Sequence, residues 1–150
     1  MIKHRFFVAV LAFAAVAGGA QADTAWEMFV ARCLDPFEHQ SVAIVDGLAA
    51  QPIDQMHEAR RAFGPNADGY VLVVDKAPSV GERACGVEAA TADPSTAERA
   101  WRYAQLSAGR YVPEGDWLVS NEWIEPRVMV RSDVSGVRAS YWIVETDLES

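Results

Sequence analysis

The sequence has few of the residues that build metal centres, with two cysteines and three histidines among its 150 residues. Its nearest approach to a zinc motif, MHEARR at 56–61, has an arginine where the H-E-x-x-H pattern needs its second histidine. Only His39 and His57 lie beyond the N-terminal segment, and nothing in the sequence fixes their spacing. We therefore expect no metal site and no cofactor.

Motifs of the common nucleotide-binding and hydrolytic sites are also missing. The chain has no G-x-G-x-x-G, Walker or G-x-S-x-G pattern and no C-x-x-C pair. A catalytic thiol needs an exposed thiolate beside a histidine, whereas Cys33 falls on the apolar side of an expected helix. These absences predict a protein that acts without catalytic machinery.

Long apolar runs are absent except near the N-terminus, where residues 6–17 follow a basic start. The run ends at a glycine pair and at Ala-Gln-Ala over 20–22, which is the build of a secretory signal peptide. About twelve apolar residues are too few to cross a bilayer, which needs about twenty. We expect cleavage before Asp23, export to the periplasm or the medium, and a soluble mature chain of residues 23–150.

Lysine is almost absent from the mature chain, which keeps Lys76 and ten arginines against 21 acidic residues, a formal charge of −10. Such an acidic surface disfavours nucleic acid or an anionic membrane as the partner. It suits a cationic partner, although acidity also serves solubility alone. We expect a protein or small-molecule partner, and the sequence leaves its identity and the oligomeric state open.

Two cysteines in an exported chain allow one intrachain disulfide. Apolar residues recur at helical spacing on the side of Cys33, at Trp26, Phe29, Val30 and Leu34. Asp23 or Thr24 would cap this helix, and Pro36 would end it. Cys85 lies in an alternating segment typical of a strand. We predict a Cys33–Cys85 disulfide that joins the first helix to the sheet.

The remaining pattern predicts one α+β domain over residues 23–150, an antiparallel sheet of about five strands with two to four helices packed on it. One helix is expected from Pro52 to Phe63, and another from an N-cap at Asp93 to Ala108. Strands are expected in the apolar or alternating segments 70–75, 85–89, 116–123, 126–132 and 137–146.

Aromatic and arginine residues gather in the C-terminal strands and form a candidate binding surface of Trp117, Trp123, Arg127, Tyr141 and Trp142. Tyr141 and Trp142 are neighbours on one strand, so they point to opposite faces of the sheet. Exposed aromatic residues beside arginines are enriched in protein-binding surfaces. The alternative is that these side chains cover a seam between helices and sheet.

Glu122 and Glu125 flank Trp123 at a strand end and form a candidate carboxylate pair. Glycosidases use two carboxylates in this way, beside the sugar that they cleave. The alternative, which we favour, is a solvated strand end with one packed tryptophan.

Three segments together, WEMFVARCLDP, CGVE and EWIEPRVMVRS…YWIVETDLES, resemble a group of small secreted proteins of alphaproteobacteria. The resemblance implies export and paired cysteines, and it supplies no catalytic residues. The sequence thus favours an exported, non-catalytic binding or accessory domain with one disulfide. The alternatives are an inhibitor of a secreted basic hydrolase such as lysozyme, a carboxylate-dependent hydrolase, and a ligand sensor with a PAS-like cavity.

Overall fold

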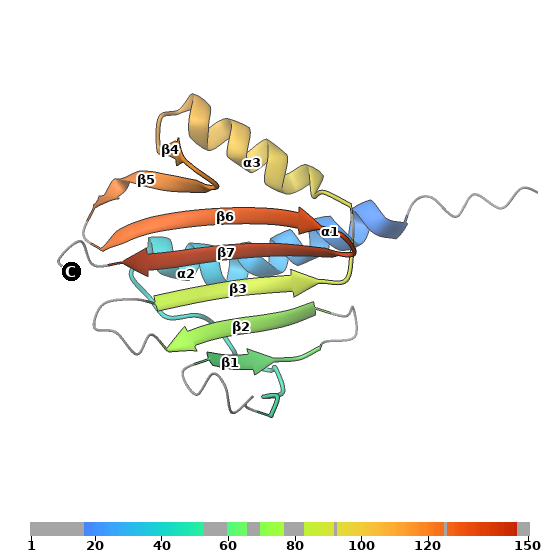
Figure 1. Ribbon diagram of the computed structural model, residues 1–150. Helices are drawn as coiled ribbons and strands as arrows, with labels where there is room; N and C mark the ends of the chain where they lie inside the picture. Colours follow the sequence, from blue (N-terminus) through green and yellow to red (C-terminus); the bar gives the residue numbers. More distant parts are fainter. Residues whose placement is uncertain are drawn as a thin grey trace, which may run out of the picture.

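A seven-stranded antiparallel sheet dominates the computed structural model, which describes residues 17–52, 60–65, 70–76, 83–91, 93–124 and 126–146. The strands lie side by side in the order β1-β2-β3-β7-β6-β5-β4 (Figure 1). Their bounds are Arg60–Phe63 (β1), Tyr70–Lys76 (β2), Arg83–Ala89 (β3), Tyr111–Glu114 (β4), Trp117–Ile124 (β5), Arg127–Ser135 (β6) and Arg138–Thr146 (β7).

Two helical segments pack on this sheet. The first is continuous and consists of α1 (Ala17–Phe29), a π-helical turn η1 (Val30–Leu34) and α2 (Asp35–Glu38). It runs across one face of the sheet behind β6, β7 and β3, and α3 (Thr96–Ser107) lies beside the β4 edge (Figure 1). Among the described residues, no helix has both the length and the apolar character that crossing a bilayer would require.

The predicted fold class was therefore wrong, since the structure has seven strands rather than about five, and two helical segments. The additional strands are the two outermost ones, β1 and β4. β1 occupies the end of the helix predicted from Pro52 to Phe63, because Arg60–Phe63 pairs with β2 over its whole length. Tertiary pairing thus outweighs the helical spacing of a short segment. Residues 53–59 of the predicted helix lie outside the described part of the chain.

The first helix does not end at Pro36, as predicted, but at Glu38. A proline inside a helix leaves the carbonyl four residues earlier without its usual donor. Here that carbonyl belongs to Arg32, and it accepts the backbone N–H of Ile44 at 2.9 Å. The Arg32 guanidinium donates in turn to the carbonyls of Ile44 and Asp46, so the chain after α2 folds back along the helix.

The predicted N-cap residues of the two helices also differ from those in the structure. Asp23 lies inside α1, and its carboxylate accepts the Ser95 hydroxyl at 2.7 Å and the Ala97 N–H at 3.0 Å. These two donors, Ala97 first, hold the pKa of Asp23 below its usual value. Ser95 rather than Asp93 caps α3, since its hydroxyl accepts the N–H of Glu98. Asp23 therefore ties α1 to the start of α3.

The core lies between the sheet and the first helix. Trp26, Phe29, Cys33 and Leu34 are all buried there, which confirms the predicted apolar face. The predicted Cys33–Cys85 disulfide is present, with a Cα–Cα distance of 5.4 Å, and joins η1 to β3.

Tyr141 and Trp142 point to opposite faces of the sheet. Tyr141 is 1% exposed and packs against α1 through Trp26 and Phe29. Trp142 stands opposite Gly86 on β3 and Arg131 on β6, on the face away from the first helix. In the part of the chain that the structure describes, both helical segments pack on the Tyr141 side.

Gly86 allows the Trp142 ring to lie flat on the sheet. A Cβ atom at position 86 would come within 3.0 Å of three atoms of that ring. Alanine normally suits a strand better than glycine, but here we expect Gly86→Ala to lower the free energy of unfolding by about 1–3 kcal/mol, because the ring must move. Urea unfolding measures this cost. With Trp142→Leu as background the cost should shrink, and an equal cost in both backgrounds would contradict the explanation.

Candidate functional site

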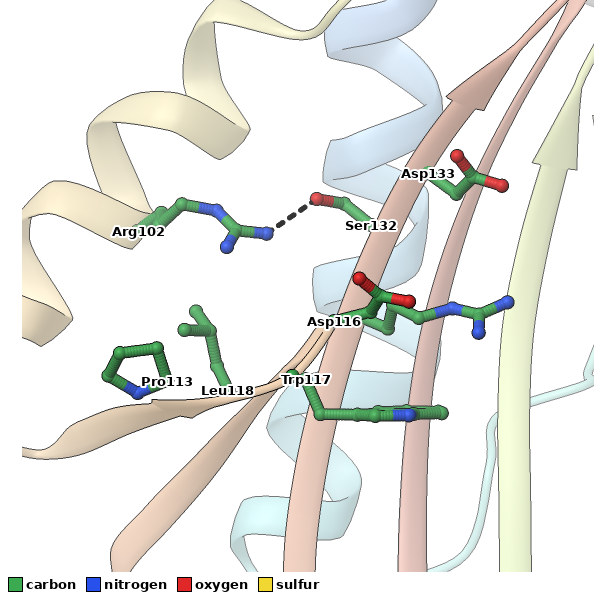
Figure 2. Close-up of a pocket in the computed structure, with 9 residues that line it drawn as sticks. Arg102, Pro113, Asp116, Trp117, Leu118, Ser132 and Asp133 are labelled. Atoms are coloured by element: carbon green, nitrogen blue, oxygen red, sulfur yellow. Dashed lines mark hydrogen bonds between the residues drawn. The ribbon is translucent and has the colours of Figure 1, made fainter.

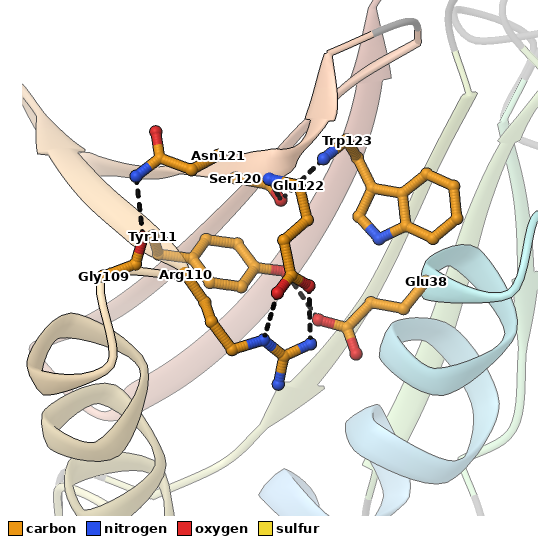
Figure 3. Close-up of polar contacts among 8 residues, drawn as sticks. All are labelled: Glu38, Gly109, Arg110, Tyr111, Ser120, Asn121, Glu122 and Trp123. Carbon is orange, nitrogen blue, oxygen red and sulfur yellow. Dashed lines mark hydrogen bonds and ion pairs between the residues drawn. The ribbon is translucent and has the colours of Figure 1, made fainter.

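A cleft of about 460 Å³ opens between the end of α2 and strand β5. We call it the acidic–aromatic cleft, and its lining residues are Glu38, His39, Gln40, Arg110, Glu122 and Trp123. Figure 3 shows Glu38 reaching toward it from α2, while Glu122 and Trp123 come from β5. Segments distant in sequence therefore build one surface.

An irregularity in β5 directs two of these side chains. The pairing of β5 with β6 shifts register between Val119 and Ile124. Within this bulge the Ser120 hydroxyl accepts the backbone N–H groups of Glu122 at 3.2 Å and Trp123 at 3.1 Å. Bulges commonly re-aim side chains next to functional sites. Here the bulge lets two consecutive residues, Glu122 and Trp123, both line the cleft.

Arg110 and Glu122 form a two-pronged ion pair across the cleft. The Arg110 Nε and Nη2 atoms donate to the two carboxylate oxygens of Glu122 at 3.0 and 2.9 Å (Figure 3). These bonds lower the pKa of Glu122 and raise that of Arg110. Glu122 is therefore a carboxylate at neutral pH and is unsuited to act as a general acid. Both side chains are largely solvated, so the pair adds little to stability.

Tyr111 holds the other carboxylate of the cleft. Its hydroxyl donates to Glu38 Oε1 at 2.7 Å, and its ring is buried against Trp101. Burial, and next the bond to Glu38, raise the pKa of Tyr111 above its ordinary value. The tyrosine therefore remains a neutral donor, and it fixes Glu38 without cancelling its charge.

The cleft rim is formed by the helix end itself. The N–H groups of Gln40 and Ser41 bond to the carbonyls of Phe37 and Pro36, which is a Schellman motif. Gln40 takes the left-handed conformation (φ 55°) that glycine usually supplies at this position. His39 approaches the Asp35 carbonyl with Nδ1 at 2.7 Å, so its other ring nitrogen is turned away from the helix.

The structure separates the residues of the predicted binding surface. Trp123 lines the cleft, whereas Tyr141 is buried under α1. Trp117, Trp142 and Arg127 lie on the opposite face of the sheet, where Arg127 is ion-paired with Glu114. Of the predicted carboxylate pair, Glu122 lies in the cleft, and Glu125 lies outside the described residues.

A second hollow of about 430 Å³ lies where the β4–β5 turn approaches α3 (Figure 2). Two of its lining residues, Arg102 and Ser132, each donate a hydrogen bond to Glu98 at 2.8 Å, and Arg102 also donates to Ser132. The guanidinium of Arg131, another lining residue, lies 5.2 Å from the Trp117 ring centre. The network of Glu98, Arg102 and Ser132 connects α3 to β6, so we assign it a structural role.

Sequence patterns did not bring together Glu38, His39, Gln40 and Arg110 of the cleft lining, and they did not point to Tyr111, which donates to Glu38. Pro36 was predicted to end the first helix, which left Glu38 outside every expected element. A signal for Arg110 was present in YVPEGDWLV, where Gly115 marks a hairpin turn that places Arg110 opposite β5. No strand was predicted over 111–114; the segment contains Pro113, and proline is tolerated in an edge strand such as β4.

Comparison of the chain with protein-family models, curated proteins and solved structures finds no match. The part of the chain described by the structure holds no group of three or more histidine, cysteine, aspartate or glutamate residues that could bind a metal ion.

Stability should fall steeply in alkaline solution because of two buried tyrosines. Burial, with the nearby carboxylates of Glu98 and Asp23, raises the pKa of Tyr141 to about 12, and the pKa of Tyr111 is raised as well. An unfolded tyrosine ionises near pH 10. Above about pH 10 the unfolded chain thus loses protons that the folded chain retains, and the free energy of unfolding decreases.

Urea unfolding at pH 9, 10 and 11 measures this effect. Tyr141→Phe should reduce the slope between pH 10 and 11, whereas Tyr103→Phe, at an exposed position on α3, should leave the slope unchanged. A free energy of unfolding that stays constant from pH 9 to 11 in the unmodified protein would contradict the assignment.

Proposed function

We propose that the chain is an exported, disulfide-bonded binding domain without catalytic machinery, and that its acidic–aromatic cleft contacts a basic protein. The observation that carries this proposal is the way the cleft is held. Tyr111 fixes Glu38, Arg110 fixes Glu122, and the Ser120 bulge directs Trp123. Side chains ordered before binding lose less entropy on binding, which favours a recognition surface.

Charge supports a basic partner. The mature chain carries a formal charge of −10, which attracts cationic proteins over long range and speeds their encounter. Within the cleft, Arg110 forms its ion pair with Glu122, and Glu38 forms no ion pair among the described residues, although its charge also acts on Arg110. A secreted basic hydrolase such as a lysozyme fits both properties, and the chain would act on it as an inhibitor.

The alternative of a carboxylate-dependent hydrolase receives less support. Such an enzyme needs one carboxyl group that stays protonated near neutral pH. The ion pair with Arg110 lowers the pKa of Glu122, which works against that role. A PAS-like sensor likewise finds less support, because the cleft is open to solvent and charged or polar side chains predominate among its lining residues.

Binding of a basic lysozyme to the mature protein tests the proposal, by biolayer interferometry at 50 and 300 mM salt together with an assay of lysozyme activity. We expect binding and inhibition at low salt, and at least tenfold weaker binding by Glu38→Gln. The matched control is Glu27→Gln, which removes an identical charge at an exposed site on α1 and should change affinity less than twofold. Absence of binding at 50 mM salt, or equal losses in the two variants, would overturn the proposal.

A further inference from the structure

We infer that the acidic–aromatic cleft accommodates one arginine side chain of the partner, with its guanidinium group between the Trp123 indole and the Glu38 carboxylate. This inference rests on the proposed function and specifies the chemistry that the cleft recognises. Its basis is the unequal state of the two carboxylates in the cleft.

Glu122 is already occupied, because both of its oxygens accept hydrogen bonds from Arg110. Glu38 accepts one hydrogen bond from Tyr111 through Oε1. A carboxylate has about four lone-pair sites, so Glu38 retains acceptor capacity on both oxygens. No described arginine, lysine or histidine forms an ion pair with Glu38, although the Glu38 charge reaches Arg110 and helps to raise its pKa. The cleft therefore presents one carboxylate that can receive a cation.

Trp123 supplies the second half of the site. Its side chain is half-buried, packs partly against the core and also lines the cleft. Glu38 and Trp123 line the same cleft, and Figure 3 draws both side chains on the same side of the Arg110–Glu122 pair. A cation placed there can contact the face of an aromatic ring and donate to a carboxylate at the same time.

A guanidinium group fits this pair of contacts better than an ammonium group or a neutral sugar. Guanidinium is planar, so it stacks on indole while its edge donates two parallel hydrogen bonds to a carboxylate. An ammonium group is compact and strongly hydrated, and it gains less from stacking. A neutral sugar could also stack on Trp123 and donate a hydroxyl to Glu38, but it lacks the positive charge that the carboxylate attracts.

Small probes test this chemistry directly. We would titrate ¹⁵N-labelled mature protein with Nα-acetyl-arginine amide and follow the indole N–H signal of Trp123, assigned with Trp123→Phe. Nα-acetyl-lysine amide matches the charge and ionic strength, and Nα-acetyl-citrulline amide matches the shape without the charge. We expect saturable binding of the arginine probe, with at least threefold weaker binding of the lysine probe and at least tenfold weaker binding of the citrulline probe.

Glu38→Gln should abolish the arginine-induced shift of the Trp123 signal, and Glu27→Gln should preserve it. Thermal unfolding of both variants shows that each is folded. If the protein binds lysozyme but the arginine probe neither shifts the signal nor competes, the inference fails and the proposed function stands. If the arginine probe binds but lysozyme does not, the choice of partner fails and the inference holds. A shift with N-acetylglucosamine oligomers and none with arginine would overturn the inference in favour of a saccharide.

Discussion

Removal of the disulfide by Cys33→Ala and Cys85→Ala together is expected to lower the free energy of unfolding by about 4 kcal/mol. The two cysteines are 52 residues apart in sequence, so the bridge closes a long loop in the unfolded chain. In the chain-entropy model, a loop of this length restricts the unfolded state enough to account for that amount. Both cysteines are fully buried, and alanine leaves no unpaired polar group in their place.

The position of the bridge adds to the effect. It joins η1 to β3, an inner strand that pairs with β7, the central strand of the sheet. Reduced unmodified protein is the natural control, because it should lose about as much stability as the double variant. Urea unfolding of the oxidised, reduced and alanine forms gives the three values. A loss below 1 kcal/mol in both altered forms would show that the bridge is not a major source of stability.

Local sequence patterns correctly predicted the helix and the strands that are determined by residues close together in the sequence. The apolar spacing around Cys33 identified the buried face of the first helix, and the apolar or alternating segments identified β2, β3, β5, β6 and β7. The disulfide was predicted because the chain was expected to be exported and has only two cysteines to pair. Each of these inferences uses residues close in sequence, or the single possible pairing of two residues.

Features that depend on distant partners were missed. β1 exists because β2 offers a partner to Arg60–Phe63, and β4 exists because β5 does. The helix continues through Pro36 because Ile44 supplies a donor to the Arg32 carbonyl. None of these partners can be recognised from the neighbouring residues in the sequence. Tertiary contacts of this kind override the helix or strand propensity of a short segment.

The same limit applies to the cleft. Trp123 and Glu122 were singled out from the sequence, but as part of an aromatic surface and of a pair with Glu125. Their neighbours in the fold are Glu38, which reaches them from the end of α2, and Arg110, which precedes β4. The site therefore depends on two structural details, the helix end and the edge strand, that sequence patterns described incorrectly.

Trp26→Ala is expected to cost about 3–5 kcal/mol, because this side chain joins three elements of the fold. Trp26 is 3% exposed, and its ring centre lies 5.2 to 5.3 Å from those of Phe29 on α1, Trp101 on α3 and Tyr141 on β7. Loss of the indole removes a large buried apolar area and its aromatic contacts with both neighbouring elements.

Trp26→Phe keeps an aromatic ring, so a smaller cost of about 1–3 kcal/mol is expected, and this variant remains informative if the alanine form does not fold. Tyr103→Ala, at a position 76% exposed on α3, should cost less than about 0.5 kcal/mol. Trp26 packs on Trp101, Trp101 packs on Tyr111, and Tyr111 donates to Glu38. Trp26→Phe should therefore also weaken lysozyme binding, because it disturbs the packing that positions Glu38. Full stability of Trp26→Phe combined with full binding would show that the cleft is held by its own hydrogen bonds alone.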